Sequence, residues 1–159
     1  MSRTQDPSTI ILHGDDTSRD RKDGVAQEEI SPGELVEVQG QVDTGVDDAR
    51  EVASQTGEAV PVPFRLALEY SHTGRGIDDD YSADDHMEFR HFKPGEEGYA
   101  WLADGENVTE DDLLVSNGDG TFRAAAGDGS EDAAAIAVPT EAVDNSGGDE
   151  AVRIRVEAI

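Results

Sequence analysis

The sequence predicts an all-β protein, a small β-barrel or sandwich of short antiparallel strands with an extended N-terminal arm. Apolar residues recur at every second position in short segments between Leu35 and Ile159, and glycine-rich turns separate these segments. No window shows an amphipathic helix of about ten residues or more. A length of 159 residues favours one domain. We therefore expect an arm at residues 1–24 and a β domain at residues 25–159.

The arm is predicted from its polarity. Residues 1–22 are polar and charged, and only Ile10, Ile11 and Leu12 offer apolar side chains for packing. We expect this segment to be ordered only where a neighbouring molecule receives it. A single strand at Thr9–His13 is the alternative.

Each strand is predicted from an alternation of polar and apolar residues that begins after the turn at Pro32-Gly33. The alternating segments are Val36, Val38 and Val42 against Glu37, Gln39 and Gln41; Leu66, Leu68 and Tyr70; Met87 and Phe89 against Glu88 and Arg90; Tyr99 and Trp101; and Val152, Ile154 and Val156 against Arg153, Arg155 and Glu157. The segment Asp47–Ser54 fits either a short helical turn or a strand edge. Asn117–Gly120 predicts a hairpin turn, because Asn and Gly accept positive φ, with Leu114-Val115 and Phe122 in its strands.

The composition excludes several classes of protein. The chain has no cysteine, which rules out disulfide scaffolds, thiolate metal sites and cysteine nucleophiles. Its 37 Asp and Glu against 12 Lys and Arg give a net charge of -25, which disfavours binding to nucleic acid or to an anionic membrane surface. No apolar run approaches the roughly 20 residues of a membrane span, and we expect no secretory signal at the N-terminus.

The scarcity of lysine points to a salt-rich environment. Lys22 and Lys93 are the only lysines, so ten of the twelve cationic residues are arginine. Repulsion between so many carboxylates is tolerable where salt is concentrated, because the Debye length falls to about 3 Å at 1 M. The composition resembles that of proteins from extreme halophiles, and an ordinary acidic mesophilic protein is the alternative.

Candidate catalytic and metal-binding groups are weak. His86 and His91 are five residues apart, which in a strand places them on opposite faces. The aspartates between Asp78 and Asp85 lack the glycine and the closing glutamate of an EF-hand. The chain contains no nucleophile elbow, P-loop or dinucleotide-binding glycine motif. We expect no catalytic residues, no metal site and no cofactor.

Scarce cations and aromatic residues predict an interface instead. Arginines among apolar strand residues often pair with a buried carboxylate or with a neighbouring subunit, whereas an exposed pair within the chain is the simpler alternative. The candidate interface residues are Ile10, Ile11, Leu12, Arg65, Leu68, Tyr70, Arg75, Arg90, Phe92, Tyr99 and Trp101.

The ordered segments resemble one known family. The stretch from Gly105 to Ala125, GENVTEDDLLVSNGDGTFRAA, resembles the passage G-x-x-V-x-x-G-D-x-L-x-x-x-x-D-G-x-x-x-x-A of small head-decoration proteins of tailed viruses. Residues 133–144 and 152–156 are similar to the closing passage of that family, and residues 30–38 resemble its opening strand. The resemblance covers residues 25–159. Asp111-Asp112 stands where the family commonly has Gly-Asp, and the segment Gly57–Lys93 is longer than in the smallest members.

This resemblance implies a compact β-barrel or sandwich, commonly trimeric, which lies on the outside of an icosahedral head and joins neighbouring capsomers. Together with the salt signature it predicts a non-enzymatic decoration protein of a tailed virus that infects a halophilic archaeon. Its partners would be the major capsid protein and two further copies of itself, with no nucleic acid and no membrane. Two alternatives stay open: a receptor- or glycan-binding module using Tyr70, Tyr81, Tyr99 and Trp101, and a metal-assisted hydrolase using His72, His86, His91 and the aspartate loop.

Overall fold

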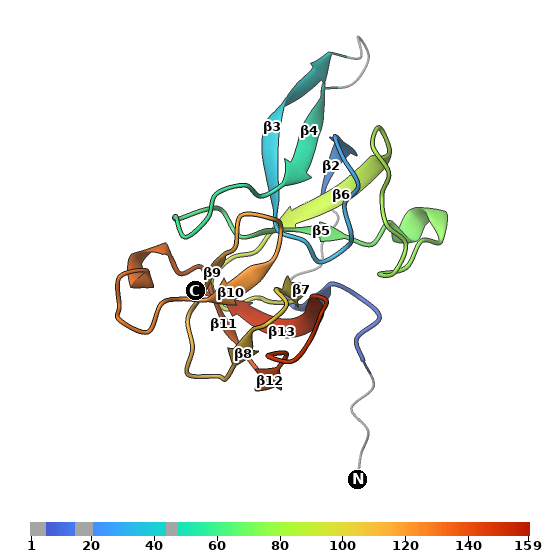
Figure 1. Cartoon of the computed structure of the whole chain (residues 1–159). Helices are drawn as coiled ribbons and strands as arrows, with labels where there is room; N and C mark the ends of the chain where they lie inside the picture. The colour runs from blue at the N-terminus through green and yellow to red at the C-terminus, as the bar shows by residue number, and fades with distance from the viewer. Residues whose placement is uncertain (1–5, 15–20, 44–47) are drawn as a thin grey trace.

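The computed structural model describes residues 6–14, 21–43 and 48–159, and over these residues the protein is all-β, as predicted (Figure 1). Two short 3-10 helices, η1 and η2, occupy Ser71–Thr73 and Asp132–Ala134. The strands are β1 (Ile11–His13), β2 (Arg21–Ala26), β3 (Val36–Asp43), β4 (Asp48–Ser54), β5 (Arg65–Leu68), β6 (His86–His91), β7 (Glu97–Leu102), β8 (Asn107–Val108), β9 (Leu114–Ser116), β10 (Phe122–Ala124), β11 (Ala137–Pro139), β12 (Val143–Asp144) and β13 (Val152–Ala158). None of the described helices is long or apolar enough to cross a membrane.

Five strands close into a barrel in the order β7-β10-β9-β11-β13, because β13 pairs back onto β7. All neighbours in this ring are antiparallel except β10 and β7, which run parallel and meet at Phe122 and Leu102. β1 pairs with the first residues of β7, Glu97 and Gly98, whereas β10 pairs with its last residue, Leu102. The predicted hairpin is confirmed as β9 and β10, with Gly118 and Gly120 both at φ 83° in its turn.

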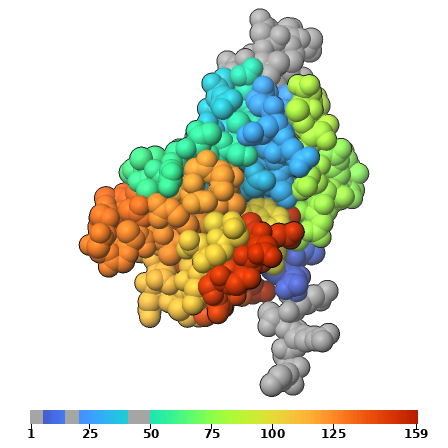
Figure 2. Space-filling model, in the orientation of Figure 1, coloured from blue at the N-terminus to red at the C-terminus, as the bar shows by residue number. Residues whose placement is uncertain are grey.

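The remaining large sheet has the order β3-β4-β2-β6-β5 and lies above the barrel in Figure 1. β2 and β4 are parallel, and the other pairs are antiparallel. The segment Asp47–Ser54 is a strand from residue 48 on, which settles that alternative. In the space-filling view the sheet and the barrel meet along a broad boundary (Figure 2).

Two hydrophobic cores fill this arrangement. The larger one occupies the barrel and the space between barrel and sheet, and it contains Leu66 and Leu68 of β5. The smaller one lies on the other face of the sheet and contains Ala67 of the same strand. Because successive side chains of a strand point to opposite faces, β5 packs into both cores at once.

The N-terminal segment is part of these layers where the structure describes it. The strand alternative for Thr9–His13 is confirmed as β1, and Ile10 is fully buried in the larger core. Residues 21–24, which we assigned to the arm, form the first part of β2, so the expected boundary between residues 24 and 25 falls inside a strand. β2 lies between β4 and β6, with a hydrogen-bonded neighbour on each side. Residues 1–5 and 15–20 of the predicted arm lie outside the described residues.

β6 departs from the predicted alternation. Met87 and Phe89 face the smaller core as expected, but Glu88 and Arg90 on the other face are also buried. The reason is that this face is covered by the barrel rather than by water. The Arg90 guanidinium lies 5.3 Å from the centre of the Phe92 ring and its Nη2 donates to Glu96 Oε1 at 2.7 Å.

Candidate functional site

The outer face of β7 and β13 gathers aromatic and cationic side chains. Their register places Trp101 opposite Arg153 and Tyr99 opposite Arg155. Ala100 and Ile154 point the other way, into the barrel core, where both are fully buried. Trp101 and Tyr99 are half-buried, so part of each ring remains accessible.

Arg153 organises one end of this face. Its guanidinium lies 4.3 Å from the centre of the Trp101 ring, and only 8% of its side chain is exposed. Nη1 donates to Asp78 Oδ1 at 2.7 Å, Nε donates to the Pro32 carbonyl at 3.1 Å, and Nη2 donates to the Ile77 carbonyl. Arg153 therefore joins the barrel to the aspartate loop and to the turn before β3 by charge-assisted hydrogen bonds.

The turn at Pro32-Gly33 fits closely against β7. The Trp101 indole nitrogen donates to the Pro32 carbonyl at 3.0 Å. Gly33 has a φ of +98°, and a Cβ there would lie 2.8 Å from the Tyr99 carbonyl oxygen. A larger residue would separate this turn from β7 and from Arg153, because the contact is with rigid backbone.

The other end of the face borders a hollow of about 470 Å³. Tyr99, Arg155, Glu97 and Glu141 line it, together with Asp6 from the N-terminal segment. Burial raises the pKa of the Tyr99 hydroxyl, and the charge of Asp6 raises it further. Tyr99 is therefore neutral over the ordinary pH range and offers a hydroxyl that both donates and accepts hydrogen bonds.

A second group of charges fastens the N-terminal segment to the sheet. Arg21 donates to Glu88 at 2.9 Å and lies 4.0 Å from Glu69. Glu69 in turn accepts the backbone N–H of Ile10 at 3.0 Å. The Glu69 and Glu88 side chains are 7% and 5% exposed, so these ions are largely removed from water. Removing one member of such an ion pair leaves the charge of the other member buried and unpaired.

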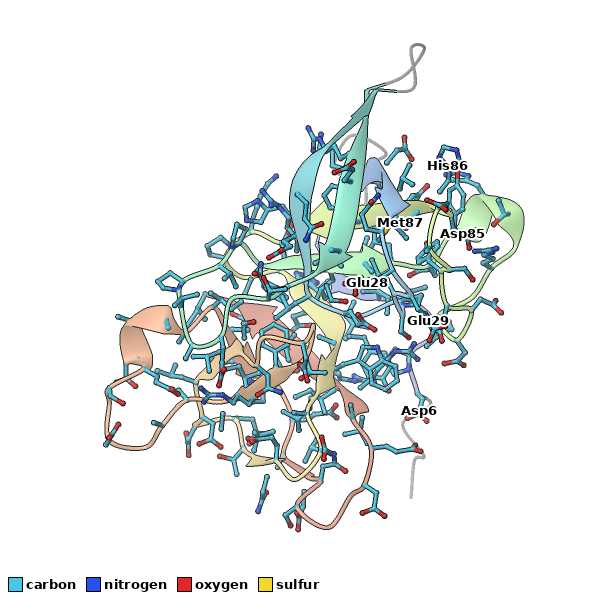
Figure 3. The ribbon with its side chains drawn as sticks, turned by 45° about the horizontal axis from the view of Figure 1, so that its top comes forward. Asp6, Glu28, Glu29, Asp85, His86 and Met87 are labelled. Carbon is cyan, nitrogen blue, oxygen red and sulfur yellow. The ribbon has the colours of Figure 1, made fainter. Side chains whose placement is uncertain are left out.

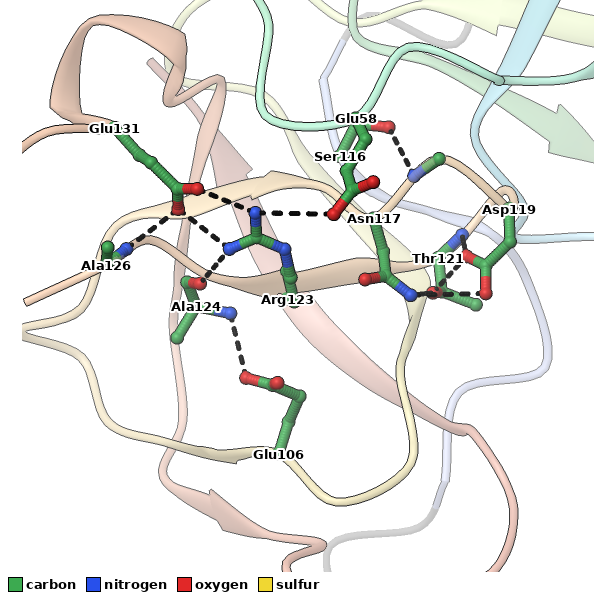
Figure 4. A network of polar contacts seen from close by, with 11 residues as sticks. Glu58, Glu106, Ser116, Asn117, Asp119, Thr121, Arg123, Ala124, Ala126 and Glu131 are labelled. Atoms are coloured by element: carbon green, nitrogen blue, oxygen red, sulfur yellow. Dashed lines mark hydrogen bonds and ion pairs between the residues drawn. The ribbon is translucent and has the colours of Figure 1, made fainter.

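A third network holds the end of β10 (Figure 4). The two terminal nitrogens of Arg123 donate to the two carboxylate oxygens of Glu131 at 2.7 and 2.8 Å, which is the bidentate geometry. This hydrogen bonding, with a second bond from the Ala126 N–H, lowers the pKa of Glu131 to about 2. Glu106 accepts the Ala124 N–H at 3.0 Å. These carboxylates are engaged within the chain, so they are structural.

The aspartate loop is also engaged internally. Asp78 pairs with Arg153, Asp79 accepts the Gly76 N–H at 2.7 Å, and Asp85 pairs with Arg75 at 3.1 Å. Figure 3 shows Asp85 and His86 together at the start of β6, far from Asp6. His91 lies at the opposite end of that strand. Among residues 6–14, 21–43 and 48–159, no group of three or more His, Asp or Glu side chains has the arrangement of a metal site.

The predicted interface residues divide by location. Ile10, Leu68, Arg90 and Phe92 are buried inside the chain, at 0–2% exposure, because barrel and sheet cover them, so they are core residues and not surface contacts. Tyr99 and Trp101 lie together on the outer face of β7. Tyr70, Arg75 and Arg65 lie elsewhere, the first two near η1 and Arg65 on β5. Ile11 and Leu12 are half-buried on β1, which pairs with β7.

Sequence reasoning missed the two arginines with the richest contacts, Arg123 and Arg153. The signal available was the scarcity of cations, which we applied only between Arg65 and Arg90. Applied to the whole chain, it would have selected Arg153 as well, because Arg153 alternates with core residues of β13.

Comparison with solved structures finds a similar fold. The crystal structure of the head fiber gp8.5 N base in bacteriophage phi29 superposes with a TM-score of 0.54 at 12% sequence identity. The match covers 87% of this chain and 92% of that one. No protein-family model matches the sequence, and no curated protein matches it either. At 12% sequence identity, this similarity shows a shared fold.

Proposed function

We propose that this chain is a structural protein of a virus head and has no catalytic role. One observation carries the proposal: the likeness to the base of a phage head fiber extends over nearly the full length of both chains. A fold can serve many functions, so the likeness supports the role by analogy. The separate resemblance of residues 105–125 to head-decoration proteins points to the same kind of particle.

The outer face of β7 and β13 supports attachment to another protein. Tyr, Trp and Arg are the residues most enriched at the centres of protein interfaces, and here they adjoin on two paired strands. We propose that this face contacts the major capsid protein on the outer surface of the head. The excess of carboxylates and the scarcity of lysine support a head that works in concentrated salt, as in a tailed virus of a halophilic archaeon.

Purified particles test this role. Intact heads should contain the chain in a fixed ratio to the major capsid protein, measured by quantitative mass spectrometry. Tyr99→Ala should lower that ratio, while Glu110→Ala, at an exposed position between β8 and β9, should leave it unchanged. Heads that lack the chain altogether would contradict the structural role. Equal occupancy of both variants would show that the outer face of β7 and β13 does not contact the capsid.

We further propose a homotrimer. A chain with few aromatic residues offers few strong contacts to a capsid, and three linked copies replace single-site affinity by avidity. Light scattering in concentrated salt should give the mass of three chains at micromolar concentration. A monomeric mass would contradict a trimer in solution, and a trimer could then form only on the capsid shell.

The glycan-binding alternative has less support. Tyr81 is fully buried and its hydroxyl donates to the Leu68 carbonyl at 2.6 Å. One face of the Trp101 ring is covered by Arg153. Stacking on a sugar ring needs an open aromatic face, so Tyr81 is unavailable and Trp101 has one face already occupied.

A further inference from the structure

Cationic side chains gather in one hollow of this acidic protein. The hollow has a volume of about 200 Å³, and we refer to it as the basic pocket. It is lined by Phe89 and by five basic residues, Lys22, Arg50, Arg65, His91 and Lys93. These include both lysines of a chain whose net charge is -25. Among the residues that the structure describes, none of those lining the pocket is a carboxylate.

The register of the sheet explains how residues distant in sequence meet there. Lys22 of β2 lies opposite Phe89 of β6, and His91 of β6 lies opposite Arg65 of β5. Arg50 of β4 shares the face of Lys22, because it pairs with Gly24 two residues further along β2. Four adjacent strands thus present a basic side chain on one face of the sheet.

The same face changes character along its length. At one end it carries the smaller core, with Ala26, Val52 and Met87, and at the other end it carries the basic residues. Phe89 lies between the two and is 1% exposed, so it forms an apolar floor. The pocket is built on regular strands, which hold its side chains more rigidly than loops do.

The positive charges in the basic pocket change the pKa of the histidine among them. Burial lowers the pKa of His91, and the charges of Arg65 and Lys93 lower it further, while Glu96 opposes them. Glu96 itself is engaged with Arg90. Within the described part of the chain, the Arg50 and Arg65 side chains make no hydrogen bond or ion pair, which leaves both guanidinium forks for an external acceptor.

We propose that the basic pocket is a docking site for a short acidic segment of a partner protein, which inserts carboxylate side chains between Arg50 and Arg65. The planar guanidinium groups suit carboxylates, because they can donate two parallel hydrogen bonds to one carboxylate. A nucleic acid fits poorly, because its phosphates continue past the pocket onto a surface dominated by carboxylates. This inference is independent of the proposed role in a virus head.

Titration with a poly-glutamate peptide tests the pocket, with calorimetry as the readout and a poly-glutamine peptide of equal length as the blank. The double variant R50Q/R65Q should weaken binding about fivefold to tenfold, since two partly exposed charge contacts are lost. The matched control is R75Q/R123Q, which changes the net charge equally at two arginines that pair with carboxylates of the chain and lie outside the pocket. It should bind the peptide as the unmodified chain does.

The pKa of His91 gives a second readout, which would not change on adding the peptide if the arginines of the pocket only stabilised the fold. Peptide binding should raise the pKa of His91, followed by NMR, because a carboxylate offsets the charges of Arg65 and Lys93. The same spectra show whether R50Q/R65Q is folded. Three outcomes overturn the proposal: equal affinity of both double variants, inorganic phosphate binding more tightly than the peptide, or a fall in the chain's own oligomeric mass in R50Q/R65Q, which would assign the pocket to a second copy.

Discussion

Phe64→Ala should destabilise the folded chain by about 3–5 kcal/mol, as expected for removal of a buried aromatic ring. Phe64 is 4% exposed and comes just before β5. Its ring stacks on Phe92 with centroids 5.1 Å apart and meets Phe122 of the barrel edge-on at 5.4 Å. The substitution removes both contacts and leaves a cavity between sheet and barrel, because neighbouring backbone cannot fully collapse into it.

Urea unfolding in concentrated salt measures this loss. Val60→Ala is a suitable control, because Val60 lies four residues away and is 46% exposed, and it should change stability by less than about 0.5 kcal/mol. A Phe64→Ala chain as stable as the Val60→Ala chain would show that the three rings do not hold sheet and barrel together.

Dilution from multimolar salt to about 0.1 M should loosen the fold or its assembly, with a large fall in melting temperature. The Debye length grows to ~10 Å at 0.1 M, so carboxylates that were screened from one another begin to repel. The net charge of -25 makes this repulsion the dominant change on dilution. The paired carboxylates such as Glu131 should be affected least, because their cationic partners are within hydrogen-bond distance.

Melting temperature and oligomeric mass across a sodium chloride series provide the measurement. Sucrose at low salt is the control, because it favours burial by exclusion from the surface without screening charge. If salt and sucrose protect equally, screening is not the cause. An unchanged melting temperature and mass over the whole series would remove the basis for salt adaptation.

The strands were predictable wherever one face is buried and the other is wet. β13 shows this from residue 154 on, since Ile154 and Val156 are buried and Arg155 and Glu157 are partly exposed, whereas the Arg153 side chain on the outer face is only 8% exposed. β6 was mispredicted on its polar face for the opposite reason. Polarity alone does not reveal that a second layer covers Glu88 and Arg90, because that layer comes from distant segments of the chain.

The two candidate surfaces could not be predicted from the sequence, because each depends on which strands pair with one another. Trp101 and Arg153 are 52 positions apart, and only the register of β7 with β13 brings them into contact. Lys22 and Arg65 likewise meet only because β2 and β5 flank β6. Their residue types were visible in the sequence as rare cations, but their common location follows from the strand order.

The closure of the barrel by β13 has a consequence for synthesis of the protein. β7 and β11 both need β13 as a neighbour, so both keep an unpaired edge on the nascent chain until residues 152–158 have left the ribosome. Open strand edges are templates for association with other chains. The acidic side chains that surround the barrel strands, among them Glu97 and Glu141, give neighbouring nascent chains the same charge and so keep these edges apart during that interval.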